Sequence, residues 1–217
     1  MKTDADIRLD VQNELQWDPS LDERAIGVNV HKGVVTLIGA VAHYADRLTA
    51  EDIAKRVAGV QAIANDIEVK MPTVGERSDP EIAEAAASAL KWNLAVGGND
   101  VKAVVKQGWI TLSGQATWEF QRIAAENAIH YLRGVKGVSN DISIKPNIKA
   151  VDVKQKIKAA FQRQAALDTN DIDVKVDDTE VTLKGHVHTW SERDDAARAA
   201  WAAPGVAKVD NQLVVQY

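Results

Sequence analysis

The chain of 217 residues has no cysteine, only five prolines and few aromatic side chains. The absence of cysteine excludes disulfide bonds, thiol catalysis and thiolate metal sites. No apolar run approaches the roughly 20 residues that a membrane-spanning helix needs. The charged first segment, residues 1–17, lacks the apolar core of a secretory signal. We therefore expect a cytoplasmic protein, or a periplasmic one if a signal peptide was removed from the sequence.

Motifs for catalysis are missing as well. The sequence contains no Ser/His/acid set, no glycine-rich phosphate loop and no H-E-x-x-H motif. The formal net charge of −5 argues against nucleic acid or a strongly anionic membrane as a general partner. We expect a protein that is not an enzyme, needs no cofactor and binds no nucleic acid.

What the sequence does contain is one module written three times. The segment VTLIGAV at 35–41 recurs as ITLSGQA at 110–116 and as VTLKGHV at 181–187, an offset of 75 and then of 71. The same two offsets relate a set of arginines (Arg47, Arg122 and Arg193), two sets of glycines (Gly39, Gly114 and Gly185; Gly59, Gly134 and Gly205) and a set of asparagines (Asn65, Asn140 and Asn211). A constant offset over separated positions predicts tandem domains, which we place at 1–72, 78–146 and 147–217.

Each domain shows the same periodicities. Apolar residues at i, i+4 and i+8, such as Ile7, Val11 and Leu15, predict an opening helix. Alternating apolar residues on either side of a short turn, as at 26–31 and 34–41, predict a β-hairpin. A second helix follows at about 45–57, 120–132 and 191–203, and a last strand at 63–69, 138–144 and 209–215. The order is α-β-β-α-β, and prolines should stiffen the linkers at 71–78 and 145–150.

These residues resemble the BON domain, a family named for bacterial osmotically inducible and nodulation-related proteins. The resemblance rests on V-T-L-x-G-x-V, an arginine early in the next helix, and G-V-x-x-V-x-N-x-[IL]-x-V, and it covers nearly the whole chain. It implies an α+β fold in which each domain is a three-stranded mixed sheet covered on one face by two helices. It also implies non-enzymatic roles in envelope or osmotic stress, with phospholipid or protein binding.

The repeated glycines and asparagines have structural interpretations. Gly39, Gly114 and Gly185 should mark the close approach of a packed helix, or a bend in the strand. Gly59, Gly134 and Gly205 should form left-handed caps at the end of the second helix. The asparagine set could hydrogen-bond backbone across a strand end. Alternatively, its carbonyls could bind a hard cation, since some BON proteins are associated with potassium.

Charged and imidazole side chains offer weaker binding sites. The three equivalent arginines could make local salt bridges, contact another domain, or recognise phosphate headgroups. His186 and His188 flank a core-facing valine, so both should point outward from one strand. They could begin a zinc or nickel site but lack an evident third ligand, and we expect no metal.

Six tryptophans stand out among so few aromatic residues. Trp17 and Trp92 are equivalent and should pack in a core or a hinge. Trp109 occupies the outward phase of its strand, Trp118 follows in the next turn, and Trp190 lies one position further along in the third domain. Such rings suit domain contacts, protein partners or membrane interfaces. We expect Trp109 and Trp118 to form an exposed or interdomain patch.

Two functions remain open at this point. The first is a stress-related binding or adaptor protein that uses three modules to engage a protein or phospholipid surface. The second is a cytoplasmic sensor of a small ligand or a potassium-type cation, whose domains become ordered on binding.

Overall fold

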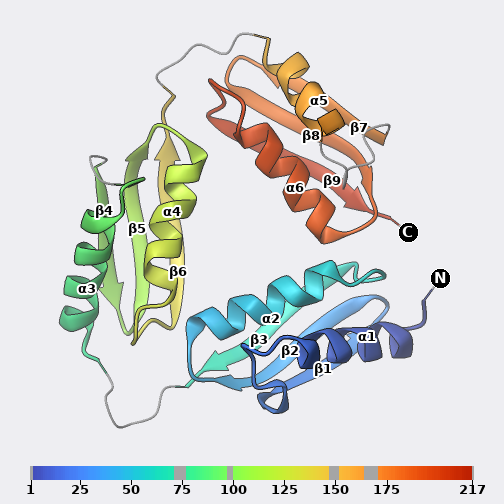
Figure 1. Ribbon diagram of the computed structural model, residues 1–217, viewed down its shortest axis with the longest axis vertical. Helices are drawn as coiled ribbons and strands as arrows, with labels where there is room; N and C mark the ends of the chain where they lie inside the picture. Colours follow the sequence, from blue (N-terminus) through green and yellow to red (C-terminus); the bar gives the residue numbers. More distant parts are fainter. Residues whose placement is uncertain (1, 71–76, 97–99, 147–151, 164–170, 217) are drawn as a thin grey trace.

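A computed structural model of the protein describes residues 2–70, 77–96, 100–146, 152–163 and 171–216. It contains three units with the same order of elements (Figure 1). The linkers expected to be stiffened by proline fall largely outside the described residues.

The elements of each unit follow the predicted order. The first unit comprises α1 (Asp4–Trp17), the short 3₁₀ helix η1 (Glu23–Ala25), β1 (Ile26–His31), β2 (Val34–Val41), α2 (Tyr44–Arg56) and β3 (Ala62–Val69). The second comprises α3 (Asp79–Trp92), β4 (Val101–Lys106), β5 (Trp109–Ala116), α4 (Glu119–His130) and β6 (Gly137–Ile144). The third comprises α5 (Val153–Arg163), β7 (Ile172–Asp177), β8 (Glu180–Val187), α6 (Trp190–Trp201) and β9 (Lys208–Val215).

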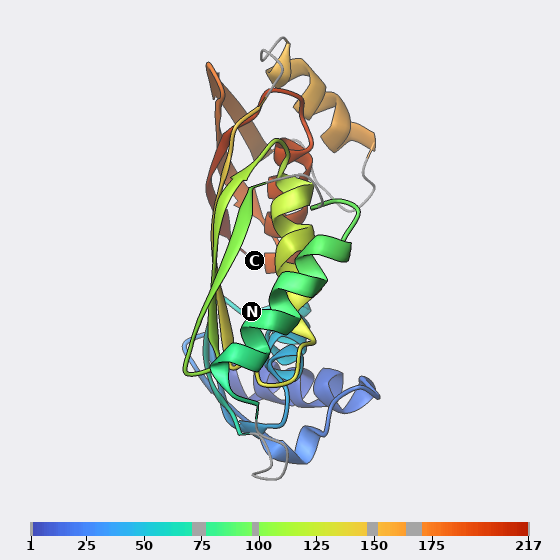
Figure 2. The same ribbon diagram turned by 90° about the vertical axis from the view of Figure 1, so that its left-hand side faces the viewer.

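Each unit forms a mixed sheet of three strands. The middle strand pairs antiparallel with the strand before it and parallel with the strand after it, in the orders β1-β2-β3, β4-β5-β6 and β7-β8-β9. Both helices of a unit lie on the same face of its sheet (Figure 2). The predicted α+β fold is confirmed. Leu37, Leu112 and Leu183 occupy equivalent core positions and are completely buried.

An aspartate at the start of the first helix also holds the hairpin turn. The Asp4 carboxylate accepts hydrogen bonds from the backbone N–H groups of Lys32 at 2.7 Å and Gly33 at 2.9 Å, and these bonds lower the pKa of Asp4. Both turn residues have positive φ, at 50° and 73°, which is the backbone of a tight two-residue hairpin turn. Asp79 holds the turn of the second unit in the same way. The helix therefore fixes the hairpin register.

The glycine of the middle strand approaches the backbone just before the first strand of its unit, not a helix packed on the sheet. Gly114 has φ +130°, and a Cβ added there would lie 1.8 Å from the backbone oxygen of Asp100, just before β4. Gly39 and Gly185 meet the equivalent backbone atoms of Ala25 and Asp171. The expected close approach exists, but the expected helix is wrong, because the start of the neighbouring strand crosses at this point.

The glycines after the second helix are not its caps. α2 ends at Arg56, and its C-cap is Val57, which has extended backbone. Gly59 follows in the turn with φ +103°, and a Cβ there would lie 2.9 Å from the side chain of Ile7 on α1. Gly59 and, in the second unit, Gly134 let the turn pass under the first helix, so the cap interpretation was wrong.

The three units close into a ring. Figure 1 shows α2, α4 and α6 on the inner side of a triangle, with α1, α3 and α5 toward its outer rim. The third unit reaches back to the first, since α6 contacts α2. Figure 2 shows the three sheets on one side of this ring and the helices on the other. The open sheet faces therefore point in a common direction.

Candidate functional site

The first residue of the second helix is the contact point between domains. The repeat offsets make Tyr44, Glu119 and Trp190 equivalent, and the same offsets relate Lys55, His130 and Trp201 near the end of that helix. Each member of the first set lies at the interface with the next domain of the ring. The ring is therefore built from three related contacts.

Tyr44 anchors the first domain to the second. Its ring meets that of His130 edge to face, with centroids 5.7 Å apart. Tyr44 is buried and belongs to the hydrophobic core of the second domain, against which Leu48 also packs. Burial raises the pKa of the Tyr44 phenol, and the nearby charge of Glu126 raises it further. The interface is dry enough to disfavour the phenolate.

Trp190 anchors the third domain to the first. Its indole packs against the core of the first domain and donates its N–H to the carbonyl oxygen of Gln61 at 3.1 Å. The guanidinium of Arg193 lies 5.1 Å from the centre of the ring. Burial acts to lower the pKa of Lys55, but Glu51, Asp52 and, across the same interface, Asp194 together raise it.

Glu119 replaces the aromatic anchor at the contact between the second and third domains. A cavity of about 420 Å³ lies at this contact. Four residues of the second domain line it (Trp118, Glu119, Phe120 and Ile123), together with three from the end of α6 (Arg198, Trp201 and Ala202). Its wall is mainly aromatic and aliphatic, which is typical of a small-molecule site.

The Glu119 carboxylate is an unusual group in this wall. Glu119 is only 7% exposed, and among the described residues it is the one charged side chain that is buried. One oxygen, Oε1, accepts a bond of 2.5 Å from Arg122 Nη2, whereas Oε2 is buried and has no partner among the described residues. Burial raises the pKa of the Glu119 carboxyl, and the ion pair with Arg122 opposes that shift. Arg122 also stacks on Trp201 of the third domain, with 5.3 Å between its Cζ and the ring centre.

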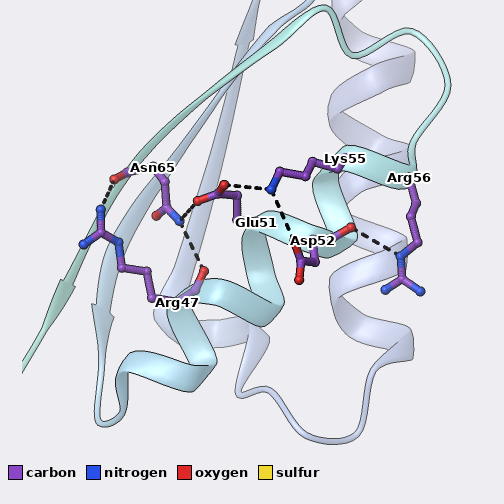
Figure 3. Close-up of polar contacts among 6 residues, drawn as sticks. All are labelled: Arg47, Glu51, Asp52, Lys55, Arg56 and Asn65. Carbon is purple, nitrogen blue, oxygen red and sulfur yellow. Dashed lines mark hydrogen bonds and ion pairs between the residues drawn. The ribbon is translucent and has the colours of Figure 1, made fainter. Parts of the chain in front are cut away.

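The other two arginines belong to a clasp between helix and strand. Arg47 Nη2 donates to the carbonyl oxygen of Asn65 at 3.0 Å, and Asn65 Nδ2 donates back to the Arg47 carbonyl at 3.2 Å and to Glu51 at 3.0 Å (Figure 3). Arg193 and Asn211 form the same reciprocal pair. In the second domain Asn140 still donates to Arg122, but the Arg122 side chain turns to Glu119.

The clasp explains the repeated asparagines. Each also accepts, through Oδ1, from the backbone N–H two residues later, at 3.3 Å for Asn65. The asparagines lie within β3, β6 and β9 and bond to helix backbone, not across a strand end as the sequence suggested. Their amide groups are thus used within the fold.

Trp109 lies on the open sheet face, as its phase predicts. Its neighbours Ile110 and Leu112 are fully buried beneath the helices, whereas Trp109 is 45% exposed. Its ring covers Gly137 on β6, where an added Cβ would meet it at 2.3 Å, and its N–H donates to Ser139 Oγ at 3.0 Å. Trp118 follows the far end of β5 and lines the cavity. The two rings therefore lie at opposite ends of β5, which spans about 23 Å at ~3.3 Å per residue.

Two further expectations from the sequence have an outcome. Trp17 and Trp92 were expected in a core or hinge, but they are 85% and 81% exposed, so this expectation was wrong. His186 and His188 are exposed, and His188 pairs with Glu192 at 3.4 Å. Across the described residues, no group of three or more His, Cys, Asp or Glu side chains could hold a metal ion.

Sequence reasoning missed Tyr44, Glu119, Phe120 and Trp201 as interface residues. The signal was present, because the repeat offsets place Glu119 in register with Tyr44 and Trp190. At this repeat position the first and third domains have an aromatic residue and the second has a carboxylate, which indicates that its contact differs from the other two.

Comparisons with known proteins agree with the repeated fold. The BON domain family matches residues 3–71, 78–146 and 150–217. Osmotically-inducible protein Y of Escherichia coli K12 is 29% identical over 146 residues, which cover 65% of this chain and 73% of that protein. In the part of the chain that the structure describes, every helix is too short or too polar to cross a bilayer.

Two solved structures align at low similarity. Both are of CdsD, a structural protein of the type III secretion system of Chlamydia trachomatis, at 15% and 14% identity and TM-scores of 0.27. The first alignment covers 96% of this chain and 91% of the CdsD chain. The second, with the C-terminal domain of CdsD, covers 100% of both chains. A TM-score this low does not establish a shared arrangement of domains. The three sequence matches and the repeated α-β-β-α-β units show that this chain belongs to the BON domain family, with three copies in tandem.

Proposed function

We propose that the protein is a non-enzymatic binding protein of the osmotic-stress response, which docks a partner protein on the shared face of its three sheets. The stress role is supported by the family and by the osmotically inducible relative. The observation that carries the docking role is the common direction of the three open sheets (Figure 2).

The sheet face has the mixed character of a protein-binding surface. Exposed apolar side chains lie in every sheet, namely Val34, Ile38, Val104, Trp109 and Val214. A partly exposed tryptophan among β-branched residues is the kind of anchor that protein interfaces use. Helices cover only the opposite face, so no helix among the described residues covers these side chains.

The charge of this face favours a protein over an anionic membrane. By strand register, the outward positions carry five lysines (Lys102, Lys106, Lys175, Lys184 and Lys208). They also carry seven carboxylates (Asp66, Glu68, Asp141, Asp173, Asp177, Glu180 and Asp210). A net acidic face repels anionic lipid headgroups and suits a neutral or basic protein surface.

The ring also gives the docking surface its strength. Each sheet alone is small, so a single contact would be weak. Three sheets held on one side of the ring bind as a unit without the entropy cost of ordering flexible linkers. This arrangement supports one large partner surface over three separate ligands.

The test is site-specific photo-crosslinking in cells under osmotic stress. A photoreactive residue at position 111 on the sheet face should capture a protein, whereas one at position 84 on the outer helix α3 should not. Vesicles of phosphatidylcholine, with and without phosphatidylglycerol, form the second arm, read by tryptophan fluorescence with Trp109→Phe as the control. Equal capture from both positions, or a Trp109-dependent blue shift with vesicles, contradicts the proposal.

A further inference from the structure

We propose that the cavity between the second and third domains binds a small aromatic molecule that carries an N–H or O–H donor. Such a molecule would fill the place that Tyr44 and Trp190 fill at the other two contacts of the ring. This inference concerns the helix side of the molecule and does not rest on the docking role of the sheets.

The first support is the relation among the three contacts. At two of them, an aromatic side chain at the start of the second helix inserts against the neighbouring domain. At the third, the equivalent Glu119 is too small to fill the same space, and a cavity of about 420 Å³ remains. The cavity has room for an aromatic ring, and it lies at a place where the fold twice accommodates one.

The second support is the chemistry of the wall. Trp118, Phe120 and Ile123 on one side and Trp201 on the other offer flat apolar surfaces. Aromatic rings gain additional stability from edge or offset contacts with such neighbours. A rigid planar ligand also loses little conformational entropy on binding.

The third support is the unpartnered oxygen of Glu119. Oε1 is held by Arg122, and Oε2 is a buried acceptor to which no described residue donates. A donor on the ligand would supply the hydrogen bond that Oε2 lacks once the Glu119 carboxylate turns toward the cavity. Trp190 shows the same pairing in reverse, since its N–H meets the Gln61 carbonyl. The Glu119 carboxylate therefore favours a neutral or cationic donor, and Arg198 is the other charged group in the wall.

The ligand would bridge α4 and α6 beside the stack of Arg122 on Trp201, which already joins the second and third domains. The contact between these domains would then combine a contact made by the chain with one made by a small molecule. In this way occupancy of the helix side could set how rigidly the third domain is held.

The experiment uses 5-fluoroindole as the probe and fluorine NMR of the full chain. We expect saturable binding at one site per chain. Fluorobenzene, which lacks a donor, should bind about tenfold more weakly, as expected for one lost hydrogen bond. Benzoate should compete poorly because it places a second carboxylate beside Glu119.

Filling variants decide whether the cavity is the site. Glu119→Trp restores the repeat pattern and should abolish probe binding while raising the melting temperature. Ala202→Phe fills the cavity from α6 and provides a second test if the first variant folds poorly. Trp92→Phe, on an exposed helix end, is the control and should bind like the wild type. Absence of saturable binding, or unchanged binding in both folded filling variants, overturns the proposal.

Discussion

The indole N–H of Trp190 donates a 3.1 Å hydrogen bond to the carbonyl oxygen of Gln61, 129 residues earlier in the chain. This contact joins the last domain to the first. It turns a string of three small domains, each marginal in size on its own, into a closed unit in which every domain has two neighbours.

Removing this anchor should open the ring. We expect Trp190→Ala to lower the free energy of unfolding by about 1–3 kcal/mol and to increase the radius of gyration measured by small-angle X-ray scattering. Trp190→Phe keeps a ring but leaves the Gln61 carbonyl without its donor. Its free energy of unfolding and its radius of gyration should lie between those of the wild type and Trp190→Ala. Trp92→Ala is the control, since its exposed ring should change stability by no more than about 0.5 kcal/mol. An unchanged radius for Trp190→Ala would show that other contacts hold the ring.

The glycine of the middle strand should tolerate no side chain. Gly114→Val places a Cβ against the Asp100 backbone and imposes a positive φ on a β-branched residue, so we expect a loss of at least ~1–3 kcal/mol. Ser113→Val, at the adjacent position on the same strand, should stay within about 0.5 kcal/mol. Denaturant titration of both variants gives the comparison, and equal midpoints would refute the close approach.

Substitutions in the asparagine clasp should lower stability, and for one of them the loss should depend on pH. Asn140→Ala removes the donor to the Arg122 carbonyl and to Glu126 at 3.0 Å each, and should cost about 1–2 kcal/mol. Asn140→Asp puts a second carboxylate beside Glu126, so its loss of stability should be larger at pH 7 than at pH 4. Thermal unfolding at the two pH values measures this. If Asn140→Asp lost the same stability at pH 4 and pH 7, the new carboxylate would not be in contact with Glu126.

Glu119 and Glu81 should give opposite pH slopes. Burial raises the folded-state pKa of Glu119 above its ordinary value of 4.5, so the folded state holds the proton more tightly. Its stabilising contribution is present below pH 4.5 and is lost as the pH rises through the raised value. The pKa of Glu81 is instead lowered by hydrogen bonds from Ser78, so its contribution is lost as the pH falls.

Glutamine variants make these slopes measurable. The stability of Glu119→Gln relative to the wild type should rise between pH 4 and pH 7, and that of Glu81→Gln should fall. Chemical denaturation at a series of pH values is the measurement. Parallel curves for the two variants would contradict the assignment.

Much of the fold follows from local patterns in the sequence. Ile7, Val11 and Leu15 are buried at the spacing that predicted α1, and the outward phase of Trp109 follows from the buried Leu112. These predictions succeed because helix and strand periodicities report directly which side chains face the core. The family pattern supplied the mixed sheet and its two covering helices.

The contacts between domains could not be predicted in the same way. Trp17 and Trp92 occupy equivalent positions but remain exposed, whereas Tyr44 is buried by a different domain. Periodicity within one repeat does not say which surface another repeat covers. The close approach at Gly114 was assigned to a helix for a similar reason, since the sequence does not show which backbone crosses the strand.

Closure of the ring changes what the order of the domains along the chain means. Each domain touches both others, and the two ends of the chain lie near each other in Figure 1. The hydrogen bond from Trp190 to Gln61 holds the third domain to the first, whereas the other two pairs of neighbouring domains are also joined by the chain. A circular permutant that joins the present ends and opens the chain between the first and second domains should therefore fold to the same triangle, with a different domain at its start.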